Sequence, residues 1–411
     1  MTYTPTELLT VYLEAAERRK VGRLALRQRR TLFEYDPAFI ASGIELSPIK
    51  LPLKSGVFTV PDMVFDGLFG LFNDSLPDGW GRLLIDRTVE KHGIRRGQLN
   101  ALDRLAYVGH NGMGALSYEP DLSENAAADQ PLVLDKLANE SAIILAGESE
   151  EVFAELLRLN GSSSGARPKI VAQVSADKKE IIHGQPALKP GFEHWMIKFG
   201  SSHDPKDIGA IEYAYSLMAK AAGVQMPETH LFRTRKRGYF GIRRFDRQGD
   251  LRLHMHSLSG LIHADHRAPT LDYKTVLSVV LTLTKNFLEA ERAYALACFN
   301  VLAHNRDDHA KNFSFLLNAK NAWVFSPAYD LTFSEGPGGE QSTMVMGEGR
   351  NPGIQQLTAL GKEHGLKKAP AILDKVRKAV AQWPRHAQKA GVSDKSIKQI
   401  AASIAASNKA K

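Results

Sequence analysis

The sequence predicts an α+β protein in which a strand-rich N-terminal region leads through a mixed central region into a mostly helical C-terminal region. Apolar and polar residues alternate through much of residues 8–60, whereas beyond Tyr273 apolar residues recur mainly at helical spacing. The 411 residues suffice for two or three structural units, and 43% hydrophobic with 24% charged residues is typical of soluble globular proteins. We expect three regions, at 1–130, 131–258 and 259–411.

The first region contains the alternating stretches 22–26 and 31–35, which predict a small antiparallel sheet. A turn at Asp78-Gly79 then leads into an amphipathic helix. Residues 119–131 are acidic, rich in alanine and without apolar periodicity. Such a composition is typical of a linker, so we place a boundary there.

The central region alternates helical and strand-like patterns. Helical periodicity runs through 132–159 and 208–222, and Gly223 is placed to end the second helix. Strand-like alternation occurs at 169–174, 194–199, 230–234 and 239–245. Because the last two stretches are joined by a basic turn, they predict a β-hairpin.

The positive charge is concentrated near the C-terminal end. The chain carries a net charge of +8, and residues 361–411 alone contain twelve Lys or Arg against three Asp or Glu, a net +9. This asymmetry favours contact between the last helices and a polyanion, for which DNA is the plainest candidate. A solvated helical surface is the alternative.

The lack of a long apolar run and the single cysteine bear on the location and chemistry of the protein. No apolar run approaches the ~18 residues that span a membrane, and the first residues do not have the pattern of a signal peptide, so we expect a cytoplasmic protein without a membrane partner. The single cysteine, Cys298, lies in an apolar helical stretch. We expect a buried, inert thiol rather than a nucleophile.

The densest polar cluster is the loop 304–312, which follows a helical pattern and precedes a short apolar strand. Phosphoryl transfer needs its residue types: Asp307 as the base, Asn312 and Asp330 as magnesium ligands, and Lys311 and His309 to neutralise phosphoryl charge. Taken singly, each residue is better explained by a structural role: Asp308 as a helix cap or loop acceptor, His309 as a packed ring and Asn312 as a turn residue. Their density in one loop favours a site. A transition-metal hydrolase site is a second interpretation. Its ligands would be His304, Asp307, Asp308 and His309.

Two further features can hold phosphate. The small-residue loop 161–169 can bring backbone amides close to a nucleotide, although its spacing is not that of a Walker loop and a flexible linker is equally consistent. Lys198 stands between Ile197 and Phe199 on a predicted strand. With Glu212 on the next helix, it can form the ion pair that positions nucleotide phosphates.

An ordered set of motifs resembles the HipA family, whose members are serine/threonine protein kinases that act as toxins of type II toxin–antitoxin systems. The set consists of 162–169, Ile197-Lys198-Phe199, Arg244-Phe245-Asp246-Arg247, 305–314 and Pro327-Ala328-Tyr329-Asp330, with 76–79 and 112–116 resembling the family's N-terminal subdomain. The resemblance covers nearly the whole chain. It implies a two-lobed, protein-kinase-like fold with an additional N-terminal β-rich subdomain and a mostly α-helical C-terminal lobe.

The resemblance also implies residue roles. Asp307 becomes the catalytic base, with Lys311 beside it, and Asn312 and Asp330 become the ligands of Mg²⁺. Residues implied to contact ATP are Ser164, Gly165, Ala166, Arg167, Pro168, Lys169, Lys198, Glu212, His256, Leu258, His309, Lys311, Asn312, Tyr329 and Asp330. His256 and Leu258 fall where the family has its adenine-contacting hinge, although His256 replaces an acidic residue there.

Regulation and partners follow from the same resemblance. Ser162 aligns best with the serine that such kinases autophosphorylate, and Ser163 and Ser164 are adjacent alternatives. A phosphate there would repel nucleotide phosphates and switch the enzyme off. The implied partners are a helix-turn-helix antitoxin (HipB-like) on operator DNA and an aminoacyl-tRNA synthetase as substrate. A small-molecule hydroxyl kinase and a catalytically relict DNA-binding co-repressor are the alternative functions.

Overall fold

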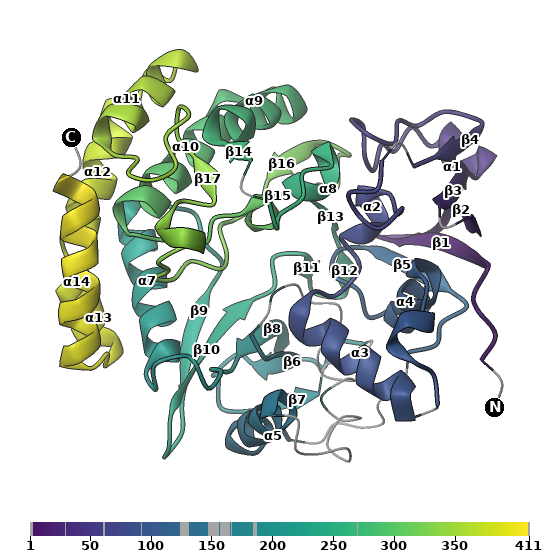
Figure 1. Ribbon diagram of the computed structural model, residues 1–411, viewed down its shortest axis with the longest axis horizontal. Helices are drawn as coiled ribbons and strands as arrows, with labels where there is room; N and C mark the ends of the chain where they lie inside the picture. The colour runs from purple at the N-terminus through teal and green to yellow at the C-terminus, as the bar shows by residue number, and fades with distance from the viewer. Residues whose placement is uncertain are drawn as a thin grey trace.

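The computed structural model describes residues 3–28, 30–60, 62–91, 93–123, 131–146, 156, 165, 167–183, 187–268 and 270–409. These residues form an N-terminal sheet, a central sheet and a helical region that carries a third, smaller sheet (Figure 1). The predicted α+β class and the order of the regions are confirmed.

The N-terminal sheet is antiparallel and has the strand order β4-β3-β2-β1-β5. Its strands are β1 (Leu8–Glu14), β2 (Arg18–Arg27), β3 (Arg30–Tyr35), β4 (Val57–Thr59) and β5 (Leu116–Glu119). Leu9, Val11 and Leu13 alternate with more exposed residues on β1, so one face of the sheet is buried. Short helices α1 (Pro37–Ala41), α2 (Gly70–Asn73) and α4 (Ala101–Val108) accompany it.

The central sheet has the order β7-β6-β8-β10-β9. Its strands are β6 (Lys169–Ser175), β7 (Ile181–His183), β8 (Phe192–Lys198), β9 (Thr229–Arg233) and β10 (Gly238–Arg243). β9 and β10 form the predicted hairpin. Two short strands, β11 (Arg247–Gln248) and β12 (Leu251–Arg252), follow as a separate hairpin.

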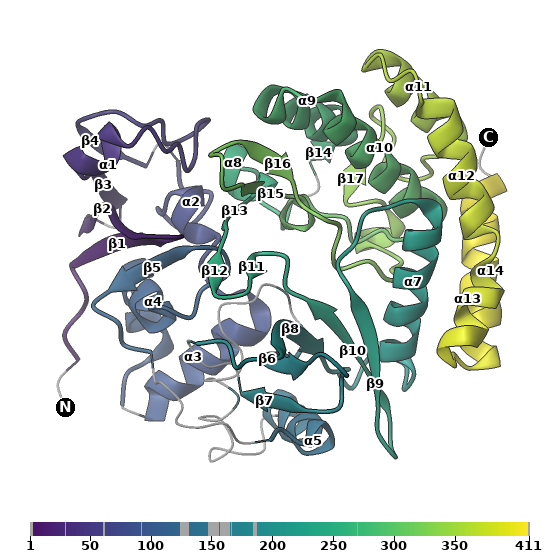
Figure 2. The same ribbon diagram turned by 180° about the vertical axis from the view of Figure 1, so that it is seen from behind.

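Helices α3 (Gly79–Lys91), α5 (Leu134–Ala146) and α7 (Ile208–Ala222) accompany the central sheet. Gly223 ends α7 as predicted, with a left-handed φ of +85° that is easy only for glycine. α5 covers the first part of the predicted helical stretch 132–159, and residues 147–155 and 157–159 lie outside the described residues. Seen from behind, α7 lies between the central sheet and α12–α13 (Figure 2).

The helical region begins beside a three-stranded sheet of β13 (His254–Ser257), β15 (Ser314–Leu317) and β16 (Trp323–Phe325). Its helices are α8 (Leu258–Ile262), α9 (Tyr273–Thr284), α10 (Phe287–Leu302), α11 (Ile354–Glu363), α12 (Ala369–Val380), α13 (Trp383–Ala390) and α14 (Asp394–Lys409). β14 (Leu271–Asp272) pairs in parallel with β17 (Thr343–Met344). Cys298 is buried in α10, as predicted, and burial raises its pKa to about 12.

Two hydrophobic clusters hold the described elements together. The larger cluster joins the N-terminal sheet to the helical region, for example through Phe33 and Leu258. The smaller cluster joins the central sheet to α5 and to Trp80 and Leu84 of α3. An N-terminal helix therefore packs with the central sheet, and the cores do not follow the order of the sequence. The boundaries predicted at 130 and 258 stay a prediction.

The loop between α4 and β5 is tied to the central region by hydrogen bonds. Asp246 accepts a hydrogen bond from the backbone N of Gly114 at 2.8 Å, and the Arg247 guanidinium donates to the carbonyls of Gly114 and Gly112 at 2.9 and 3.1 Å. Gly114 has a φ of +69°, and an added Cβ would lie 3.1 Å from the backbone N of Met255. The glycine allows this close approach.

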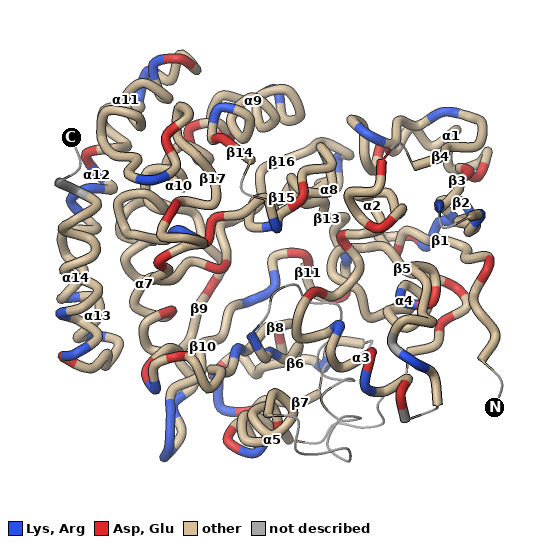
Figure 3. Tube along the Cα trace, in the orientation of Figure 1, with Lys and Arg blue, Asp and Glu red and all other residues tan. Residues whose placement is uncertain are grey.

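Basic residues are spread along the C-terminal helices and the tip of the β9–β10 hairpin (Figure 3). The C-terminal helices lie at the side of the molecule remote from the N-terminal sheet (Figure 1). Of the helices in the described ranges, none is both long and apolar enough to cross a membrane.

Candidate active site

A cavity of about 500 Å³ lies where the central sheet, the helical region and the start of α3 meet. Its lining residues include Lys198 of β8, Phe240 of β10, Asp307 and Asn312 of the loop after α10, and Asp330. The sequence separates these residues by more than 130 positions. The structure therefore brings most of the predicted phosphoryl-transfer residues to one cavity.

Lys198 lies between two carboxylates at the cavity. On β8, Trp195 and Ile197 point into the core of the central sheet, so the alternating residue Lys198 faces the other side. Its ammonium group contacts the carboxylate of Asp330 and lies 3.5 Å from Oε2 of Glu212 on α7. The predicted Lys198–Glu212 ion pair is confirmed. Burial opposes the charge on Lys198, but the two carboxylates hold its pKa above the usual value.

Asp330 is held ionised by the cations around it. Burial would raise its pKa, but Lys198, Lys169 and Arg167 hold the pKa well below its usual range. Its φ of +56° lies in the left-handed region, which is uncommon for a residue with a side chain. Uncommon backbone of this kind is typical of functional sites.

Two more cations belong to this wall. Arg167 pairs with Glu212 at 3.1 Å and with Asp204 at 2.8 Å. Lys169 is 3% exposed on β6, opposite Lys198 in the strand register, and burial lowers its pKa to about 8. Gly165 has a φ of +106°, which residues with a side chain rarely adopt, and an added Cβ would lie 2.5 Å from the Lys169 ammonium, which would have to move.

The loop after α10 forms the opposite wall. Asp307 is exposed to the cavity, and the surrounding protein partly removes its hydration, which raises its pKa. The side-chain amide N of Asn312 donates to the backbone O of Asp307 at 2.7 Å. This bond fixes the amide and leaves the Asn312 carbonyl oxygen available as a ligand.

Asp308 has a structural role instead. It is fully buried and accepts hydrogen bonds from the Tyr273 hydroxyl at 2.6 Å, the Gln341 amide at 2.9 Å and the backbone N of Thr343 at 3.1 Å. Burial raises its pKa to about 7. The interpretation of Asp308 as a loop acceptor is therefore confirmed.

Lys311 is paired across the cavity with the N-terminal region. Its ammonium donates to both carboxylate oxygens of Asp78, at 2.7 and 2.9 Å, in the turn before α3. The Tyr329 hydroxyl donates to the backbone O of Lys311 at 2.5 Å, which braces the loop. His309 also lines the cavity, and its Nδ1 is buried without a hydrogen-bond partner in the part of the chain that the structure describes.

Other predicted site residues lie elsewhere. The His256 ring is buried against Asp74 and Ser47, at 2.6 and 3.0 Å, and Leu258 belongs to the larger core. Their side chains do not reach the cavity, which is lined there by their neighbours Met255 and Ser257. Pro168 is buried and does not line it either. Ser162, Ser163, Ser164 and Ala166 lie outside the described residues.

The transition-metal interpretation finds no support in the geometry. His304 points away from the cavity, with Nδ1 2.6 Å from the Ser407 hydroxyl and Nε2 3.1 Å from Glu335. Asp308 is buried behind the loop. Within the described ranges, no three His, Cys, Asp or Glu side chains are grouped as metal ligands.

Sequence reasoning missed several residues that line the cavity, among them Asp78 and His266. Asp78 was interpreted as part of a turn and of the N-terminal subdomain's motif at 76–79, and neither feature indicates a distant partner for its carboxylate. His266 lines the cavity, with its ring 5.5 Å from that of His309. Burial and the nearby Lys311 lower the pKa of His266 to about 4, so it is neutral at physiological pH.

Family models match both halves of the chain. A model described as the HipA N-terminal domain matches residues 9–119, and one described as the HipA-like C-terminal domain matches residues 161–407. The chain belongs to the HipA family. Its fold is accordingly the two-lobed, kinase-like α+β fold of this family with an additional N-terminal subdomain.

One solved structure has a similar fold over nearly the whole chain. A chain in the complex of Shewanella oneidensis MR-1 HipA, HipB and operator DNA matches over 97% of this chain and 95% of its own, with a TM-score of 0.68 and 18% identity. At this identity the likeness shows the fold alone. The proinflammatory kinase CtkA of Helicobacter pylori matches over 35% of this chain and 51% of its own, with 18% identity and a TM-score of 0.27.

The HipA fold implies a nucleotide and a divalent cation, and the residues of the cavity fit both groups. Lys198, Lys169 and Arg167 gather around one wall and suit a polyphosphate. Asp330 and Asn312 offer the carboxylate and carbonyl oxygens that Mg²⁺ prefers. Gly165 leaves space beside Lys169, and His309 has an unused ring nitrogen among the described residues.

Proposed function

We propose that this HipA-family protein is an ATP- and Mg²⁺-dependent protein serine/threonine kinase that acts as the toxin of a toxin–antitoxin system. One observation carries the proposal: Lys198 is held by Glu212 and Asp330 on one wall of the cavity that Asp307 and Asn312 line on the other. Phosphoryl transfer requires cations for the phosphates and a carboxylate for the attacking hydroxyl, in the same site. A relict site would have no reason to retain all five residues.

In the proposed mechanism, bound ATP supplies the phosphoryl group and Mg²⁺ neutralises and orients its phosphates. Asp307 orients the attacking serine or threonine hydroxyl and accepts its proton. Asp330 and Asn312 hold the cation, and Lys198 with Lys169 binds phosphate oxygens. Lys311 stabilises charge near Asp307 and is itself positioned by Asp78.

The remaining contacts to ATP are also proposals. The segment 164–169 covers the phosphates, and Arg167 orders Glu212 beneath them. His309 and Tyr329 line the site near the loop. Met255 and Ser257, rather than His256 and Leu258, are the neighbours of the adenine ring, because their side chains face the cavity.

Regulation and partners extend the proposal. Autophosphorylation of Ser162 would add close to two negative charges beside the phosphate site and inactivate the kinase. The HipA chain of S. oneidensis is found with HipB and operator DNA. We infer a HipB-like helix-turn-helix antitoxin, operator DNA bound through it, and an aminoacyl-tRNA synthetase as the phosphorylated substrate. The basic C-terminal helices can add contacts to the DNA.

The test replaces the base. Asp307→Gln should lower the transfer of radiolabelled phosphate from ATP, to Ser162 and to protein substrates, by a factor of about a thousand or more. The control is Asp374→Gln, which removes a partly exposed carboxylate on α12 that pairs with Arg377 and Lys378 and does not line the cavity, and which should leave transfer unchanged. Phosphoproteomics after brief induction of the wild type and Asp307→Gln would name the substrate. Equal transfer by the two proteins would refute the proposed role.

The same experiments separate the alternatives. A small-molecule hydroxyl kinase would show no autophosphorylation but would turn over a metabolite in an Asp307-dependent manner. A relict co-repressor would bind operator DNA with strong salt dependence and would not bind nucleotide.

A further inference from the structure

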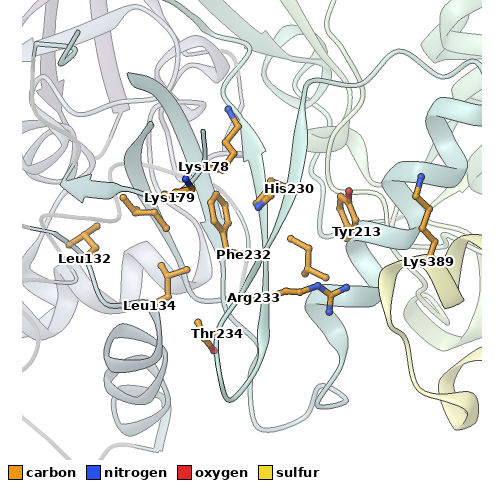
Figure 4. A pocket seen from close by; sticks show the side chains of 12 residues that line it. Leu132, Leu134, Lys178, Lys179, Tyr213, His230, Phe232, Arg233, Thr234 and Lys389 are labelled. Atoms are coloured by element: carbon orange, nitrogen blue, oxygen red, sulfur yellow. The ribbon is translucent and has the colours of Figure 1, made fainter. Parts of the chain in front are cut away.

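A second hollow, of about 640 Å³, runs along strand β9 (Figure 4). Leu134, the first residue of α5, and Leu132 just before the helix lie on one side of it. Tyr213 of α7 and Lys389 of α13 lie on the other side, with Phe232 of β9 between them. We call this hollow the β9 groove. It lies outside the candidate active site and shares no lining residue with that cavity.

β9 is the edge strand of the central sheet at this groove. In the hairpin, the backbone N of Thr234 donates to the O of Arg237 at 2.9 Å, which marks a hydrogen-bonded pair of the β9–β10 register. Because such pairs alternate, the backbone N–H and C=O groups of Leu231 and Arg233 face away from β10. No strand in the described part of the chain pairs with this edge.

The groove is basic. Four of its lining residues are cationic and none is Asp or Glu: Lys178, Lys179, Arg233 and Lys389. Lys178 is neutralised by Glu193 and Glu228, at 3.1 and 3.4 Å, and Lys179 lies 3.6 Å from the exposed Asp177.

The charge that remains is exposed on one side of the groove and at its end. Arg233 donates to the backbone O of Ala390 at 2.7 Å. Because a backbone carbonyl has no net charge, this bond does not neutralise the guanidinium. Lys389 is exposed, and residues 235–237 add basic charge at the end of the hairpin (Figure 3). A segment beside β9 would therefore meet uncompensated positive charge.

We propose that the β9 groove binds an extended acidic segment of a partner protein, which joins the central sheet as an additional strand beside β9. The outward N–H and C=O groups of Leu231 and Arg233 would pair with its backbone. Its side chains would alternate between the Leu132–Leu134 side and the Tyr213–Lys389 side, because the two sides of the groove lie on opposite faces of an extended strand. Acidic side chains on the second side would meet Lys389.

Charge also decides which segments this edge accepts. Lys and Arg along an edge strand discourage pairing with basic or neutral strands, including a second copy of the same edge. They favour a strand of opposite charge. The five residues of β9 are long enough to pair with a segment of similar length.

The experiment uses the full-length protein and a fluorescein-labelled peptide of about seven residues that alternates valine and glutamate. Fluorescence anisotropy should detect binding of this peptide. The same peptide methylated on alternate backbone nitrogens loses N–H donors to β9 and should bind at least about tenfold more weakly, which corresponds to 1.4 kcal/mol. Lys389→Glu should weaken binding about fivefold, and Lys395→Glu, an exposed lysine on α14 outside the groove, should not. Hydrogen exchange of the Leu231 and Arg233 amides should slow on binding.

Several results would overturn the proposal. These are no binding of the acidic peptide, equal binding of the N-methylated peptide, or equal effects of Lys389→Glu and Lys395→Glu. Dimerisation of the protein through β9, seen as a mass that doubles with concentration and protection of the same amides without peptide, would assign the groove to a second copy. The measurement requires no catalysis, so its outcome does not depend on the proposed kinase activity.

Discussion

The two faces of the loop 304–312 carry the same kinds of residue and perform different tasks. On the cavity face, Asp307 is exposed and the Asn312 side chain donates to the backbone of the loop itself. On the buried face, Asp308 accepts three hydrogen bonds from Tyr273, Gln341 and Thr343. The comparison shows how a catalytic carboxylate is kept available: its neighbour holds the backbone, so its own oxygens remain uncommitted.

Asp308→Ala should have the largest effect, because it removes the buried carboxylate that stabilises the loop. It leaves the donors of Tyr273, Gln341 and Thr343 without their acceptor in a buried site, which should cost about 3 kcal/mol of stability. The melting temperature should fall by several degrees, measured by differential scanning fluorimetry. Asp307→Ala is the matched change on the exposed face and should leave the melting temperature almost unchanged. Equal shifts for both variants would contradict the separation of roles.

Asp78→Asn sharpens the comparison on the cavity face. Lys311 would keep its charge but lose the carboxylate that fixes it at 2.7 and 2.9 Å, so the phosphoryl group would be less well positioned. We expect a fall of about tenfold in kcat with little change in the KM for ATP. Steady-state kinetics would check this split, and Asp78→Glu should recover part of the loss. An equal fall for Asp78→Glu would indicate a merely structural contact.

The sequence predicted the parts of the fold that depend on local pattern. The antiparallel N-terminal sheet, α7 with its terminal Gly223 and the β9–β10 hairpin follow from periodicity and turn residues, which act within a few positions. The sharing of one core between the N-terminal sheet and the helical region was not predictable. It depends on which apolar faces meet in space, and the apolar pattern of an element does not specify the face against which it packs.

The same limit applies to the site. Asp307, Asn312, Lys198 and Asp330 could be chosen because motif order and the HipA resemblance carry information across the chain. The ion pair between Asp78 and Lys311 joins residues 233 positions apart, and neither has a local signal for the other. His256 illustrates the opposite case. The family resemblance implied that His256 lies at the hinge, but strand alternation turns its side chain into the core and its neighbours toward the cavity.

The smallest expected effect is the pH dependence of ATP affinity due to Lys169, on the wall opposite the loop 304–312. Burial lowers its pKa to about 8, so in the free protein its ammonium loses a proton as the pH rises through that value. If the charged form binds phosphate, the affinity for ATP should fall about fourfold between about pH 7 and pH 8.5, as the protonated fraction falls. Titration calorimetry would measure this. Lys169→Arg stays charged over that range and should bind ATP with a nearly constant affinity. If the ATP affinity of Lys169→Arg fell by the same factor over this pH range, the titrating group would be a residue other than Lys169, because the arginine does not lose its proton there.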